Sequence, residues 1–278
     1  MEAPLRSNGS NTRQGLSTTP RGAGRSRVAG RVDRVINTAL AGERSAVLNV
    51  SAAELLSEPA AVTAVIGAAV DRPGVGLMGH WMVHELFRRS DLYPDLLNAL
   101  ASPNPVTRAA AARVCGAARI TEAVLWLGDL LADSNSAVRE SAVRALAQMG
   151  GRRAVEELMA ESGRIPVYRL AIALSQAASD MDIEALMRQP ASEAAAVATV
   201  LACGLRRDVL RVSPLLGIAH DRRWPKKVRV AACKALAAIG DRSAADGLHR
   251  LAMSDPDPSI KAAADRGYRR LLKRAVGR

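Results

Sequence analysis

The chain has 278 residues and a formal net charge of +12 at pH 7, and 49% of its residues are hydrophobic but only 3% are aromatic. The three cysteines, Cys115, Cys203 and Cys233, are widely spaced and form no Cys-x-x-Cys pair, which excludes a disulfide framework and a zinc ribbon. We expect them to be buried, reduced thiols inside a core of Ala, Leu and Val, a composition that favours closely packed helices over sheets.

Residues 1–27 are rich in Ser, Thr, Gly, Asn and Arg and contain almost no large apolar side chain. Such a segment cannot bury enough surface to offset its ordering entropy. We therefore predict a disordered basic tail at 1–27, with a net charge of +4. From residue 28 onward the pattern becomes periodic, and these apolar residues share one helical face: Val28, Val32, Val35, Ile36 and Leu40.

An internal repeat organises the folded part, which we place at 28–278. Residues 136–158 align without gaps to residues 226–248, at an offset of 90 residues or three periods of 30. Further copies begin at Ser102 and at Asp255, one period away on either side. Units of this size are pairs of helices that must stack on their neighbours to bury their apolar faces.

The unit at 136–158 has a local signal for each of its parts. A cluster of Asp, Asn and Ser precedes the first helix and predicts its cap, and Gly150 predicts the left-handed turn that ends it. Gly240 predicts the same turn in the second copy. The first helix carries the stripe Val138, Ala142, Ala145, Leu146 and Met149, and the second carries Ala154, Val155, Leu158 and Met159.

The pattern Asp-x-x-x-x-Val-Arg-x-x-Ala-x-x-Ala-Leu-x-x-Met/Ile-Gly resembles bacterial HEAT repeats, especially the short variety also seen in phycobilisome-lyase-like proteins. It is clearest over 102–158 and 226–272, and weaker over 160–220 and 28–100. The resemblance implies an all-α, right-handed α-solenoid of short HEAT-like helical pairs, with the Val-Arg-x-x-Ala helices lining its concave face.

The same resemblance gives the arginine of the motif a structural role. In HEAT-like proteins this side chain joins a ladder with acidic residues of the turns between helices. Here it implies that Arg139 and Arg229 pair with Asp133 or Asp221.

The positive charge is concentrated at the ends of the chain. Residues 28–203 carry 16 basic and 19 acidic residues, whereas residues 204–278 carry 18 basic and 7 acidic ones, a net charge of +11. Such a field attracts polyanions or an acidic protein surface. A polar outer face on a terminal repeat would produce a similar excess.

We predict that the concave, basic C-terminal surface binds the partner. The register of the repeats places Arg144, Lys234 and Arg266 at equivalent exposed positions, where they would form a basic column along the groove. The candidate partner-binding residues are Arg144, Arg222, Arg223, Lys226, Lys227, Lys234, Arg266 and Arg270.

One cluster suggests metal chemistry. His80 and His84 are four residues apart on one helix face, with Glu85 beside them. A His-Glu pair within a helical repeat resembles the iron-ligand motif of deoxyhypusine hydroxylases, which repeat the pair several times. This chain contains it once, so we predict no metal and no cofactor and leave metal binding by His80 and His84 open.

A second enzymatic comparison is with the HEAT-like DNA alkylpurine glycosylases, which place a carboxylate near aromatic side chains beside DNA. Trp126, Trp224 and Tyr268 lie in separate repeats, and no motif of that family surrounds them. A bilin lyase is a third enzymatic comparison, but the repeat is the only feature of this chain that resembles those proteins. Nucleotide-binding and α/β-hydrolase motifs are absent from the sequence.

The sequence thus predicts a non-enzymatic interaction scaffold or adaptor for an acidic protein. A HEAT-like DNA- or RNA-binding protein, including a glycosylase-like one, is the alternative. No apolar run approaches the ~18 residues that span a membrane, and the N-terminus lacks the apolar segment of a secretory signal. We therefore predict a cytoplasmic protein, whose partner and oligomeric state the sequence does not specify.

Overall fold

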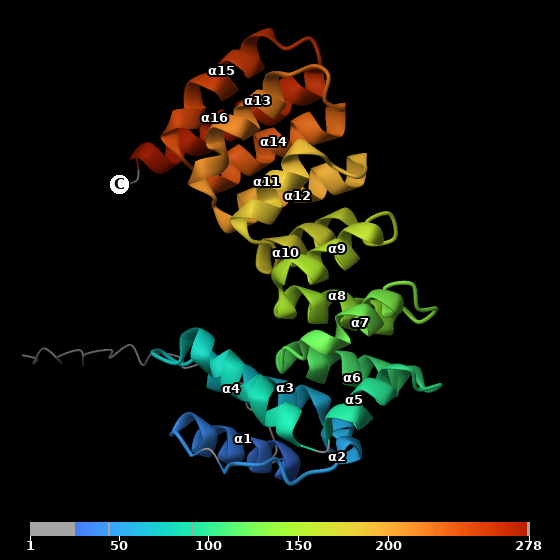
Figure 1. The fold of residues 1–278 in the computed structure, drawn as a ribbon. Helices are drawn as coiled ribbons and strands as arrows, with labels where there is room; N and C mark the ends of the chain where they lie inside the picture. The colour runs from blue at the N-terminus through green and yellow to red at the C-terminus, as the bar shows by residue number, and fades with distance from the viewer. Residues whose placement is uncertain (1–25, 44, 91, 277–278) are drawn as a thin grey trace, which may run out of the picture.

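The computed structural model describes residues 26–43, 45–90 and 92–276. Throughout this part of the chain every regular element is a helix, and the helices stack into an open arc (Figure 1). The predicted all-α solenoid is confirmed, while the handedness of its superhelix stays a prediction. Most of the predicted tail, residues 1–25, lies outside the described residues. The first helix begins at Arg27, where the Ser26 hydroxyl accepts a hydrogen bond from the Ala29 N–H at 2.9 Å.

Two rows of helices run along the arc. The inner row consists of α3 (Pro59–Val70), α6 (Pro105–Ala117), α8 (Ser136–Met149), α10 (Val167–Ala177), α12 (Glu193–Arg206), α14 (Lys226–Ile239) and α16 (Pro258–Val276). The outer row consists of α5 (Leu92–Leu100), α7 (Val124–Leu130), α9 (Gly151–Ala160), α11 (Asp180–Arg188), α13 (Val212–His220) and α15 (Ala245–Ser254). Short 3-10 turns lead into three of the outer helices: η1 (Thr121–Ala123), η2 (Val209–Arg211) and η3 (Arg242–Ala244).

Three further helices close the N-terminal end of the array. They are α1 (Arg27–Leu40), α2 (Ala52–Ser57) and α4 (Gly76–Arg89). Helix α4 packs against α1, α3 and α5, so this end departs from the simple alternation of the later repeats.

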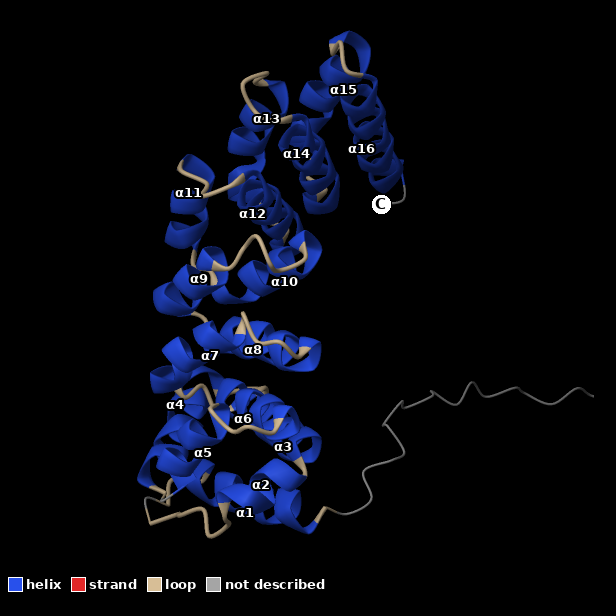
Figure 2. Cartoon of the chain, turned by 90° about the vertical axis from the view of Figure 1, so that its right-hand side faces the viewer, coloured by secondary structure: helices blue, strands red, loops and turns tan. Residues whose placement is uncertain are grey.

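The inner row lies on the concave side of the arc. Successive inner helices pack directly against each other, from α6 against α8 to α14 against α16, whereas successive outer helices make looser contacts. An array whose inner helices are closer together than its outer ones bends toward the inner row. Figure 2 shows this arrangement, with α7, α9, α11 and α13 on the left and the inner helices on the side toward which the array curves.

The unit predicted at 136–158 has the expected local structure. All nine residues of its two apolar stripes are buried. The Asn135 side chain caps α8 by accepting hydrogen bonds from the N–H groups of Ala137 and Val138. Gly240 ends α14 in the predicted left-handed conformation, with φ of 82° and ψ of 17°. Gly150 ends α8 with a φ of 66° that also favours glycine, but its ψ of −171° is extended, so the left-handed turn predicted there is wrong.

Small residues let the backbones of neighbouring inner helices approach closely. A Cβ atom added to Gly116 of α6 would lie 2.6 Å from the Ala145 Cα of α8. A Cβ atom added to Gly204 of α12 would lie 2.8 Å from the Ala235 Cα of α14. The neighbour in each case is backbone rather than a movable side chain, so glycine and alanine at these positions set the spacing of the inner row.

Arginine–aspartate pairs connect consecutive turns, in a pattern that the sequence predicts only in part. Arg108 Nε donates to the Asp133 carboxylate at 2.7 Å, and the buried Arg229 guanidinium donates to the buried Asp255 carboxylate. The predicted partner of Arg229, Asp221, is incorrect, because Arg229 reaches forward to the turn of the next repeat. The Asp221 carboxylate instead accepts hydrogen bonds from Arg223.

Arg139 has partners of a different kind. Its guanidinium donates to the backbone carbonyls of Asp133, at 2.7 Å, and Ser134, at 2.9 Å. The contact with Asp133 is therefore made, but through the main chain, because the Asp133 carboxylate is already hydrogen-bonded to Arg108.

We expect Gly204→Ala to lower the free energy of unfolding by about 1–3 kcal/mol, because the new methyl group must push α12 away from α14. Chemical denaturation followed by circular dichroism measures the change. Gly217→Ala is the matched control, since Gly217 lies within α13 with no atom within 4 Å of the added Cβ. There we expect a gain of about 0.5–1 kcal/mol. Equal destabilisation by both substitutions would contradict the proposed spacing constraint.

We expect Asp255→Asn to destabilise the protein by about 3 kcal/mol, because it leaves the Arg229 guanidinium buried without a counter-charge. The side chains of this pair are only 6% and 3% exposed. Asp265→Asn breaks the exposed pair with Arg269 and should cost less than about 0.5 kcal/mol. The same denaturation experiment compares the two, and a similar small cost for both would show that the buried pair is not structural.

Candidate interaction surface

Each inner helix exposes one narrow stripe of side chains, and together these stripes form the inner face of the arc. The inner helices from α6 to α14 are covered on two sides by their neighbours in the row and behind by the outer helices, so only the side toward the concavity stays accessible, whereas α16 has a row neighbour only in α14. On α8 the accessible positions are Glu140, Arg144 and Gln148, and on α12 they are Val197, Leu201 and Leu205. The spacing of three or four residues is that of one helix face.

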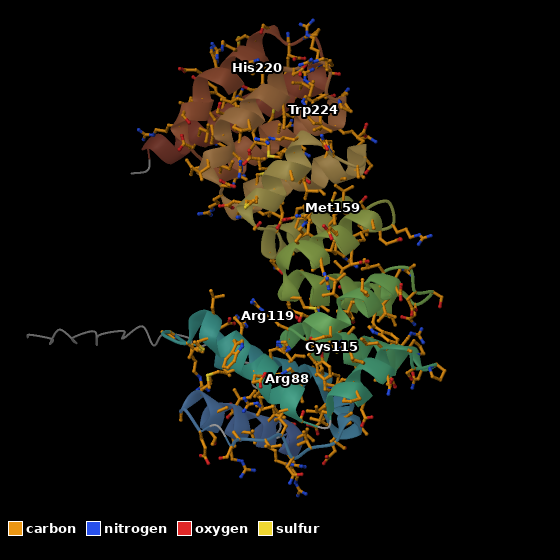
Figure 3. The ribbon with its side chains drawn as sticks, viewed as in Figure 1. Arg88, Cys115, Arg119, Met159, His220 and Trp224 are labelled. Carbon is orange, nitrogen blue, oxygen red and sulfur yellow. The ribbon has the colours of Figure 1, made fainter. Side chains whose placement is uncertain are left out.

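A continuous groove runs over the N-terminal half of this face. A hollow of about 350 Å³ lies between α8 and α10, and hollows of about 220 and 580 Å³ extend from it toward α3, α4 and α6. Gln148 lines all three, and Arg144 lines two of them. Arg119, which follows α6 and is labelled in Figure 3, lines the largest hollow together with Asp71 and His80.

Three arginines and one glutamate define the charge of the two hollows of about 350 and 220 Å³. Glu140 lies between Arg144, at 3.2 Å, and Arg169, at 3.5 Å, and all three side chains are about half exposed. Arg113 on α6 donates only to the backbone carbonyl of Ala109 in its own helix. The basic side chains therefore outnumber the one acidic group between them, and this part of the inner face stays positive.

The C-terminal part of the inner face carries a second basic group. Lys234 lies in the middle of α14, and Arg266 and Arg270 are one turn apart on α16. All three side chains are exposed, and none makes an ion pair with another described residue. Arg144, Lys234 and Arg266 are thus all exposed at equivalent positions of their repeats, and their common face stays a prediction from the register.

The other four candidate residues lie at the edge of the array rather than on the inner face. Arg222 and Arg223 belong to the turn between α13 and α14, which Trp224 marks in Figure 3, and Lys226 and Lys227 begin α14. All four are exposed. The structure therefore separates the eight candidates into two groups, one on the inner face and one along an edge.

Three of the edge residues already have acidic neighbours. Lys226 Nζ lies 3.1 Å from Asp257, and its hydrogen bond holds the pKa of that carboxyl below its usual value. Lys227 lies 3.3 Å from Glu193. Arg223 lowers the pKa of Asp221 in the same way as Lys226 does for Asp257.

The sequence did not predict an apolar interval in the column of basic residues. On the two helices between Arg144 and Lys234, the inner face presents Ile172 of α10, which is 39% exposed, and Leu205 of α12, which is 42% exposed. Leu201, one turn before Leu205, is partly buried. These positions fall in the region 160–220, where the repeat pattern is weak. The accessible positions recur every three or four residues along each inner helix, and this spacing is the sequence signal that could have predicted these apolar residues.

The residues of the His80–His84–Glu85 cluster have different neighbours. The Glu85 carboxylate accepts hydrogen bonds from Arg88 and Arg89, which lower its pKa to about 2. His84 Nε2 lies 3.6 Å from Glu122, and His80 lines the large hollow. Across the described residues, no three His, Cys, Asp or Glu side chains gather closely enough to hold a metal ion.

The aromatic residues considered for glycosylase chemistry are far apart in the array. Trp126 lies on the outer helix α7, Trp224 lies in the α13–α14 turn, and Tyr268 of α16 packs on the ring of His249 with centroids 4.8 Å apart. None of the three lines the groove between α3 and α10. No helix in the described ranges is long and apolar enough to cross a membrane.

The three cysteines are buried free thiols, as predicted. Cys115 lies within α6, where Figure 3 labels it. Burial raises the pKa of Cys115 to about 12 and the pKa values of Cys203 and Cys233 to about 11. At neutral pH these thiols are protonated, so they lack the thiolate that a nucleophile or a metal ligand needs.

Comparison with known proteins identifies the repeat. Residues 93–177 match the family model of HEAT repeats, so this part of the solenoid consists of HEAT repeats. Among curated proteins no relative matches. A solved structure of human deoxyhypusine hydroxylase in complex with glycerol is 18% identical, with a TM-score of 0.35, and the alignment covers 88% of this chain and 97% of that one. A crystal structure of an engineered protein is 20% identical, with a TM-score of 0.29 and coverage of 87% and 96%.

These comparisons correct one prediction. The sequence predicted that the protein is not an enzyme, and the similarity to deoxyhypusine hydroxylase, itself an enzyme with HEAT-like repeats, contradicts that prediction. The prediction failed because it took a helical repeat without familiar catalytic motifs to be non-catalytic, and a fold of this kind does not decide activity. At this low TM-score the likeness assigns no reaction to the chain.

We expect all three native thiols to be unreactive toward Ellman's reagent at pH 8, because on the order of one in a thousand is ionised and none is accessible. Denaturation should expose all three cysteines to the reagent. The absorbance of the released product, measured before and after denaturation, gives the number of thiols that react in each state. Ser134→Cys, in an exposed turn, provides a fast-reacting control. Rapid reaction of a native cysteine would contradict the burial described above.

Proposed function

We propose that this protein is an interaction scaffold whose inner face binds an acidic segment of another protein. The observation that carries the proposal is the group formed by Lys234, Arg266 and Arg270. These three cations share one face, are exposed, and have no carboxylate partner among the described residues. Exposed cations without internal partners produce a positive field, which attracts the carboxylates of an acidic segment.

The basic residues along the edge of the array can contribute to the same binding at a small cost in stability. Lys226, Lys227 and Arg223 each have an acidic neighbour, but the cationic side chains are 54%, 81% and 91% exposed. Exposed ion pairs contribute only about 0–1 kcal/mol. These side chains can therefore exchange an internal carboxylate for one on the partner with little loss of stability.

A nucleic acid is the alternative partner, and one observation favours the protein over it. The phosphates of nucleic acid are evenly spaced, so they match a continuous track of cations best. The inner face instead presents Ile172, Leu201 and Leu205 between its two basic parts. An acidic protein segment can space its charges to fit such an interruption.

The three free thiols support a location in the cytoplasm, because reducing compartments keep cysteines unpaired.

The test uses a labelled peptide of about 20 residues with glutamates near both ends, and fluorescence anisotropy with the full-length protein. We expect salt-dependent binding, weakened at least about tenfold by the double substitution Lys234→Glu/Arg266→Glu, because each reversal replaces an attraction by a repulsion. The matched control is Arg153→Glu/Arg250→Glu, which changes the net charge equally on the outer helices α9 and α15. It should change the affinity less than about twofold.

Equal weakening by the two double variants would show that the peptide responds to net charge and not to the inner face, which overturns the proposal. Tighter binding of a duplex DNA of matched length, with a steeper dependence on salt, would establish the nucleic-acid alternative instead.

A further inference from the structure

The inner face has three zones of different chemistry along its length. The first zone is basic and comprises Arg144 and Arg169 around Glu140. The second is apolar and comprises Ile172, Leu201 and Leu205 on α10 and α12. The third is basic again and comprises Lys234, Arg266 and Arg270 on α14 and α16.

Resting on the function proposed above, we infer that the bound segment has an apolar stretch flanked by acidic groups on both sides. Its apolar side chains contact α10 and α12, and its acidic groups contact α8 at one end and α14 and α16 at the other. The ligand class is thus an acidic–apolar–acidic protein segment, which is narrower than an acidic partner in general.

The apolar zone is a surface that a ligand can cover. Ile172 lines the hollow of about 350 Å³ between α8 and α10, together with Ala147 and Ala173. Arg144 and Arg169 line the same hollow, so apolar and cationic groups border one depression. An isolated exposed Leu or Ile on a protein surface is ordinary. Here Leu201 and Leu205 lie on the accessible stripe of α12, and Ile172 lies between Arg169 and Gln176 on the stripe of α10, the helix that packs against α12.

The spacing of the zones sets the length of the segment. The step from α8 to α14 crosses three helix–helix contacts of about 8–10 Å each, or roughly 24–30 Å in total. An extended chain rises about 3.3 Å per residue, so about eight or nine residues separate the two acidic groups. The apolar side chains then fall in the middle of that interval, over Ile172 and Leu205.

The test compares three labelled peptides of equal length and equal charge, each with acidic residues about nine positions apart. One has leucines between the acidic groups, one has serines there, and one has the leucines moved outside the acidic groups. We expect the peptide with central leucines to bind the full-length protein at least about tenfold more tightly than the other two.

Variants of the protein locate the preference. Ile172→Ser/Leu205→Ser should abolish the tenfold preference for central leucines and leave the affinity for the serine peptide unchanged. Leu125→Ser on the outer helix α7 removes a residue that is 64% exposed, and it should leave the preference intact. Circular dichroism of each variant verifies that the fold is retained.

The outcomes separate this inference from the function on which it rests. If the serine peptide binds as tightly as the peptide with central leucines, the inference is wrong and the proposed function stands. If no peptide binds, the proposed function fails as well. If the preference survives Ile172→Ser/Leu205→Ser, the apolar contact lies elsewhere and the inference is overturned.

Discussion

The close approach of successive inner helices is the constraint on which the rest of the structure depends. Gly116 faces Ala145 and Gly204 faces Ala235, so backbone meets backbone without an intervening side chain. The inner row is therefore tighter than the outer row, and the array bends toward it. The same packing covers each inner helix from α6 to α14 on three sides, so each of these helices presents a single stripe to the concavity. The curvature of the array and its accessible inner face thus follow from one steric cause.

The turns keep this packing in register. Arg108 and Arg229 each bridge from one repeat to the turn of the next, and the carboxylates they contact, Asp133 and Asp255, also accept backbone N–H groups of their own turns. A single aspartate thus orders a turn and joins two repeats. The middle repeats have Val167 and Ala196 at the corresponding helix positions and lack this bridge. There Arg206 of α12 donates instead to the Ala178 carbonyl and to Asp180 of the preceding repeat.

Sequence analysis predicted the features whose signals are local. The stripes around Val138 and the glycine-ended helices follow from residues a few positions apart, and the structure contains them. It assigned Arg229 the wrong partner because Asp255 belongs to another repeat. It also missed the left-handed residues Arg119 and Arg207, since arginine gives no signal for that conformation. The apolar zone escaped notice because residues 160–220 lack the motif, although their burial pattern continues the repeat.

The single accessible stripe per helix has an evolutionary consequence. Most positions of an inner helix are fixed by contact with three neighbours, and substitutions there are removed by selection for stability. Two or three positions per helix are free of that restriction, and Arg144, Ile172 and Lys234 are among them. A descendant of this chain can therefore acquire a chemically different inner face by a handful of substitutions spread over distant codons. Divergence of that face and retention of the fold are separable in such a protein.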